Sequence, residues 1–84
     1  MKRHGSVVEF VVAQKDLDEA LAIVNEQTDG KCVIGTRPQG NQVHVEVMSA
    51  SLSPPEIAKL EQSLNEEAHV HNYSAGVAQK EVEF

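Results

Sequence analysis

The stretch Ser6–Ala13, read as Ser-Val-Val-Glu-Phe-Val-Val-Ala, constrains the fold more than any other part of the chain. Nearly every position is apolar, whereas a strand with one solvated face alternates apolar and polar residues. Alternation gives one face with Val8, Phe10 and Val12 and a second face with Val7, Glu9, Val11 and Ala13. We predict a central strand that is buried on one side by the domain and at least half-covered on the other.

Length, charge and cysteine content limit the class of protein. The 84 residues make a single domain over 1–84, with 1–5 as a flexible N-terminus and 77–84 as an extra strand or a tail. A net charge of −6 argues against nucleic acid and anionic membranes as partners, because both attract a basic surface. The single cysteine, Cys32, excludes an internal disulfide, and no apolar run approaches the ~20 residues of a membrane span. We therefore expect a cytoplasmic protein.

Turn and capping signals divide the rest of the chain into two helices and three strands. Ser53, followed by two prolines and Glu56, is typical of a helix start with a capping box. The predicted elements are a helix at Leu17–Thr28, a strand at Lys31–Thr36, a turn at Arg37–Gly40, a strand at Asn41–Met48, a helix from Ser53 to Ala68 and a strand at Val70–Ser74.

The order strand-helix-strand-strand-helix-strand predicts a ferredoxin-like α+β sandwich, βαββαβ, with two helices on one face of a four-stranded antiparallel sheet. Right-handed crossovers then give the strand order 4-1-3-2. This topology carries many unrelated activities, so it does not predict a function.

The helix-free face of this sheet is the candidate site, because it combines apolar and titratable side chains. We expect it to carry Val7, Glu9, Val11, His44, Glu46, Met48, His71 and Tyr73. Several apolar groups on one flat surface indicate a partner. The first hypothesis is an interaction or ligand-binding module that forms a homodimer or higher oligomer through this face and takes a protein or small-molecule partner there.

Two alternatives use the titratable groups of the same face. If the strand registers align, His44 and His71 lie two strands apart with Glu9 between them, and two imidazoles with a carboxylate suit a divalent transition metal. Glu46 would be a fourth ligand, or His69 would replace His71. The first hypothesis needs no cofactor. The third hypothesis is a small enzyme in which His44 acts with Glu9 or Glu46 as an acid/base pair.

A weaker candidate is Arg37, which the turn between two glycines would present to an anion. No helix follows this turn, so it is not a phosphate loop. Cys32 lies at a strand position where packing is the ordinary role of a cysteine.

Overall fold

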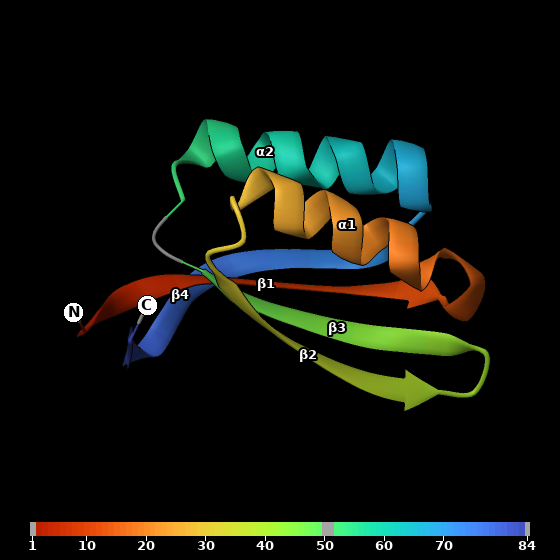
Figure 1. Ribbon diagram of the computed structural model, residues 1–84, viewed down its shortest axis with the longest axis horizontal. Helices are drawn as coiled ribbons and strands as arrows, with labels where there is room; N and C mark the ends of the chain where they lie inside the picture. Colours follow the sequence, from red (N-terminus) through yellow and green to blue (C-terminus); the bar gives the residue numbers. More distant parts are fainter. Residues whose placement is uncertain (1, 50–51, 84) are drawn as a thin grey trace.

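The chain forms two layers, a four-stranded antiparallel sheet and two helices that cover one of its faces (Figure 1). The computed structural model describes the backbone of residues 2–49 and 52–83 and the side chains of residues 5–49 and 52–76. The elements are β1 (Lys2–Ala13), a 3₁₀ turn (Gln14–Asp16), α1 (Leu17–Gln27), β2 (Cys32–Gln39), β3 (Gln42–Ser49), α2 (Pro54–Ser63), a π-helical turn (Leu64–Ala68) and β4 (His71–Glu83).

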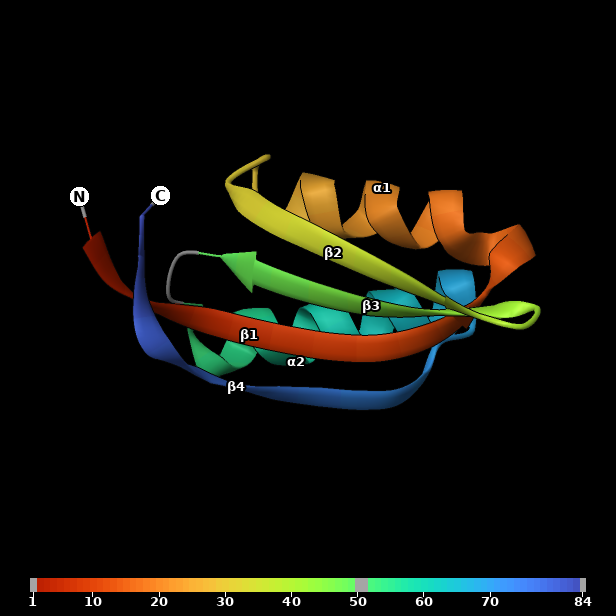
Figure 2. The same cartoon turned by 90° about the horizontal axis from the view of Figure 1, so that it is seen from below.

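The strand order across the sheet is β2-β3-β1-β4, which confirms the predicted ferredoxin-like topology. Strand β1 lies in the interior of the sheet and pairs with β3 on one side and with β4 on the other (Figure 2). Its ladder with β3 runs from Ser6, opposite Ser49, to Ala13, opposite Gln42. The nearly continuous apolar character of this strand therefore reflects its interior position, as predicted.

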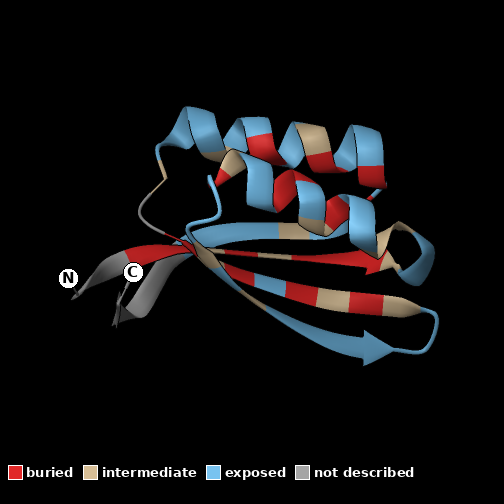
Figure 3. Cartoon of the chain, in the orientation of Figure 1, coloured by how far each residue is buried: buried red, intermediate tan, exposed pale blue. Residues whose placement is uncertain are grey.

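The hydrophobic core lies between the sheet and the helices. Every second side chain of the central strands points into it. Buried and more exposed residues follow each other along β3, and the buried positions of both helices face the sheet (Figure 3). The core consists of Val8, Phe10, Val12, Val43, Val45 and Val47 from the sheet with Ala20, Ile23, Val24, Leu60, Leu64, Ala68 and Val70 from the helical side. The thiol of Cys32 is free, and this half-buried side chain packs against the core, in the packing role predicted for it.

At both chain ends the observed strands extend further than the sequence predicted. Residues 2–5, expected to be a flexible terminus, belong to β1, and Lys2 lies opposite Glu83. Residues 77–83 are neither a separate strand nor a tail, because they continue β4 through Ala75 and Gly76. Gly76 lies opposite Val7 in the ladder. Glycine has a backbone N–H and a carbonyl like other residues, so Gly76 pairs with β1 and does not end β4.

The hairpin between β2 and β3 turns later than predicted. Gly40, with φ of +67°, and Asn41 form the turn, whereas Arg37 and Pro38 are part of β2. A positive φ at the first central residue alone fits a type II′ turn, which matches the twist of paired strands. Pro38 is tolerated because β2 is an edge strand with one unpaired side.

Truncation of the buried side chain of Leu60 tests the core. Leu60 is 1% exposed and packs between α2 and the sheet, so Leu60→Ala should lower the free energy of unfolding by about 2–5 kcal/mol. The adjacent Lys59 is exposed, and Lys59→Ala is the matched control with an expected change within about 0.5 kcal/mol. Urea denaturation followed by circular dichroism measures both. Equal losses in the two variants would contradict the assigned core.

The start of α2 provides a second test. The backbone N–H of Ser53 donates to Glu56 Oε1 at 2.9 Å, and the N–H of Glu56 donates to Ser53 Oγ at 3.4 Å, so both bonds of the predicted capping box are present. The backbone N–H of Ser53 holds the pKa of Glu56 below its ordinary value, and the Ser53 side chain adds to this effect. Ser53→Ala should lower the free energy of unfolding by about 1 kcal/mol.

The pH dependence of the same box follows from the direction of the shift. Because the pKa of Glu56 is lower in the folded chain, its contribution is present above the unfolded pKa and is lost as the pH falls through the folded pKa. Glu56→Gln should therefore reduce the loss of stability on acidification relative to the wild-type chain. Urea denaturation at a series of acidic pH values checks this, and an identical pH profile in the two proteins would contradict it.

Candidate functional site

The helix-free face of the sheet, called here the open face, carries three bands of side chains that run across the strands. Strand register defines each band, since residues opposite one another share a face. The apolar row is Val33, Met48 and Val7; the acidic pair is Glu46 and Glu9; the basic row is Arg37, His44 and His71, with Val11 between the two histidines. Figure 2 views the sheet from this side.

The apolar row is only partly covered within one chain. Val33 is 51% exposed and is the large hydrophobic side chain left exposed among residues 5–49 and 52–76. Met48 and Val7 are half-buried, whereas Val11, between two histidine-bearing strands, is 8% exposed. Val7 is thus half-buried and Val11 is buried, in agreement with the expected half-covered second face of β1.

His44 and Glu9 approach one another across the diagonal between β3 and β1. The distance from His44 Nε2 to Glu9 Oε1 is 3.7 Å, and the two side chains are 29% and 41% exposed. This separation exceeds hydrogen-bond length, so the attraction is that of an ion pair when the imidazole is protonated. Because solvent reaches both groups, the pair contributes at most about 1 kcal/mol to stability.

The geometry assumed for a metal site differs from the observed register. Val11, not Glu9, lies between His44 and His71, so the two imidazoles are separated by an apolar side chain. Across residues 5–49 and 52–76, no group of three or more His, Cys, Asp and Glu side chains is close enough to hold a metal ion. Metal binding by His44, His71 and Glu9 stays a prediction without a preformed cluster.

Tyr73 lies on the opposite face from the one predicted. Phe10 faces two residues of β4, Asn72 and Tyr73, because the register shifts between Glu9 and Val11. This β-bulge, with Asn72 at φ of 56°, reverses the alternation and turns Tyr73 toward the helices. The Tyr73 hydroxyl donates to the carbonyl oxygen of Ile57 in α2 at 3.3 Å. Only a three-dimensional register reveals such a bulge.

His69, the alternative metal ligand, is also outside the open face. It follows the π-helical turn with φ of 54° and precedes β4, so it ends the helical segment rather than entering the sheet. His71 is thus the one histidine of this pair that the sheet presents beside Val11.

Arg37 lies in a shallow hollow at the β2 edge of the open face. The hollow, of about 160 Å³, is lined by Gly35, Thr36, Arg37, His44 and Glu46. A carboxylate in the same hollow opposes an anion, so the arrangement lacks the uniformly positive lining of an anion site. Anion binding by Arg37 stays a prediction.

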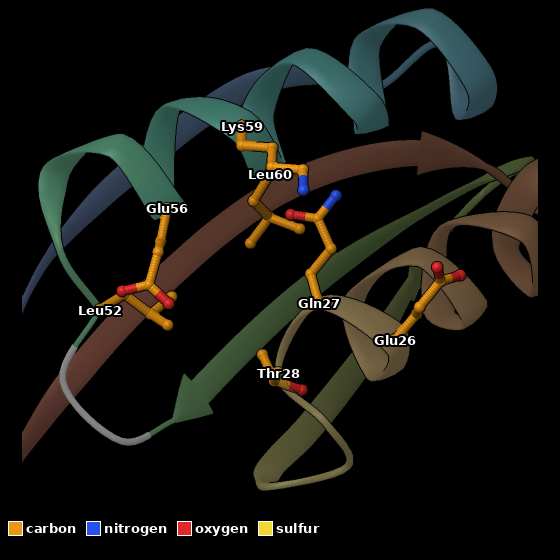
Figure 4. Close-up of a pocket in the computed structure, with 7 residues that line it drawn as sticks. All are labelled: Glu26, Gln27, Thr28, Leu52, Glu56, Lys59 and Leu60. Atoms are coloured by element: carbon orange, nitrogen blue, oxygen red, sulfur yellow. The ribbon is translucent and has the colours of Figure 1, made fainter.

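A second hollow, which the sequence reasoning missed, lies between the two helices (Figure 4). Gln27 and Glu26 from α1 and Glu56 and Lys59 from α2 form its polar walls, above Leu60. Gln27 Nε2 donates to Ser63 Oγ at 2.9 Å and links the two helices across this gap. No helical spacing in the sequence brings these polar groups together, because they meet only through the packing of α1 beside α2.

Comparison with known proteins identifies the class of fold. No protein-family model and no curated protein matches the sequence. The solution structure of the C-terminal domain of the MgtC protein from Mycobacterium tuberculosis superposes with a TM-score of 0.74 at 14% identity, covering 90% of this chain and 88% of that chain. A likeness at this identity shows a shared ferredoxin-like fold and no more. In the part of the chain that the structure describes, no helix combines the length and apolar character needed to cross a membrane.

Ionisation of Tyr73 tests its position under α2. Burial raises the pKa of Tyr73 to about 12, and the negative charge of Glu61 acts in the same direction. Because the folded pKa lies above the ordinary value of about 10, this contribution to stability is fully present below pH 10 and is lost as the pH rises toward 12.

Ultraviolet absorbance of tyrosinate measures this ionisation without ambiguity, because the chain has one tyrosine. In the native protein the signal should rise well above pH 10, whereas in concentrated urea it should rise near pH 10. Coincident curves in the two solvents would place Tyr73 on the solvated face instead. Tyr73→Phe should remove the signal.

Proposed function

We propose that this protein is a small interaction module that forms a homodimer through the open face of its sheet. The observation that carries the proposal is the apolar row, in which Val33 is 51% exposed next to half-buried Met48 and Val7. Three adjacent apolar groups on a flat surface form a patch rather than scattered exposure. A second copy covers this patch with its own open face, because a two-fold interface uses the same face of both copies.

The size of the open face sets the expected strength of association. Four strands about 4.8 Å apart and eight residues of about 3.4 Å rise give a footprint of roughly 500 Å² for each copy. Stable complexes bury about 800 Å² for each partner, so this face supports a reversible dimer. We expect a dissociation constant in the micromolar range.

The proposed setting is the cytoplasm, where a lone thiol such as Cys32 stays reduced. The net charge of −6 disfavours nucleic acid as a partner, because a polyanion binds a basic surface. A different protein or a small ligand on the open face would be an alternative occupant of the same apolar row.

Sedimentation equilibrium over a concentration series tests the proposal. The wild-type chain should change from monomer to dimer over the micromolar range, and Val33→Lys should weaken association about tenfold or more by placing a charge in the apolar row. Ala58→Lys makes the same change in charge at an exposed position of α2 and should leave association unchanged. A wild-type chain that stays monomeric at every concentration would contradict the proposal.

A further inference from the structure

The centre of the open face holds two like charges in direct opposition. Glu9 of β1 and Glu46 of β3 are register partners, so their side chains project beside each other about 5 Å apart. Directly opposed like charges weaken a sheet. His44 lies 3.7 Å from Glu9 on one side, but Glu46 is exposed, and the repulsion in the acidic pair is only partly offset within one chain.

Positive and titratable groups lie one step further along the strands. Arg37 and His44 are register partners, and both Val11 and His71 continue the same line across the sheet. Two residues of strand separate this basic row from the acidic pair, a distance of about 7 Å. Charge on the open face is therefore segregated into two parallel bands.

We propose that two copies pair face to face about a two-fold axis that crosses the strands between the acidic pair and the basic row. This inference rests on the proposed homodimer and fixes its orientation. The axis exchanges the two bands, so Glu46 lies over His44 of the partner subunit and beside Arg37 of the partner subunit. Glu9 lies between His44 of the partner subunit and His71 of the partner subunit. Arg37 of the partner subunit thus supplies a positive charge to the acidic pair, and the partner's histidines add to it when they are protonated.

The other two-fold arrangement of these faces has its axis along the strands and exchanges β3 with β1. It sets Glu46 over Glu9 of the partner subunit, and the two-fold axis produces a second, identical contact between the same two residues.

The axis along the strands sets Met48 over Val7 of the partner subunit. The axis across the strands instead sets Met48 over Gln42 of the partner subunit, because the row of Gln39, Gln42 and Ala13 there faces the apolar row. Apolar contact alone therefore favours the axis along the strands. That axis also brings four carboxylates together, a cost that outweighs this contact, so charge complementarity favours the axis across the strands.

Reversal of one charge distinguishes the two orientations, because they predict opposite signs. With the axis across the strands, Glu46→Lys sets a cation over His44 and Arg37 of the partner subunit and should raise the dissociation constant about tenfold. With the axis along the strands, the same change creates an attraction to Glu9 of the partner subunit and should lower it. Glu66→Lys, at an exposed position of the helical layer, is the control with the same change in net charge and should not weaken association.

Sedimentation equilibrium of the intact chain measures these constants, and thermal melting at high dilution checks the fold. The Glu46→Lys monomer should be no less stable than wild type, because the substitution replaces the like-charge pair with Glu9 by an attraction. Tighter or unchanged association of this variant would overturn the proposed orientation while leaving the homodimer intact. A monomeric wild-type chain would instead overturn the homodimer itself.

Discussion

The packing of β1 beneath the two helices is the interaction on which the rest of the structure depends. Phe10 is fully buried at the middle of this strand, and Val8 and Val12 extend its buried side in both directions. The same strand supplies backbone partners to β3 and β4, so it joins the two halves of the chain in one sheet. Loss of this strand would leave each half with too little apolar surface to bury in a domain of 84 residues.

The interior position of β1 also determines the character of the open face. Its second side must lie between β3 and β4, where neighbouring side chains cover Val11 but leave the apolar row half-exposed. The same position sets Glu9 directly opposite Glu46. The half-exposed apolar row and the opposed carboxylates of this face are the observations from which the proposed module is argued.

Sequence reasoning recovered the features that depend on local pattern. Alternation identified the core positions of β1 and β3, and the Ser53 and Glu56 pair identified the start of α2. Some features that depend on pairing between strands were not predicted from the sequence. The bulge opposite Phe10 moved Tyr73 to the helix side, the register put Val11 between the histidines, and the ladder with β1 carried β4 beyond Gly76.

The sequence by itself determined the order of the elements, the buried side of each central strand and therefore the ferredoxin-like topology. Period-2 alternation and helix caps depend only on residues close together in the sequence. Only the tertiary structure decided which titratable groups meet. The contact of His44 with Glu9 and the opposition of Glu9 and Glu46 depend on the register between strands. That register is a property of the paired backbones, and a single bulged residue changes which side chains share a face.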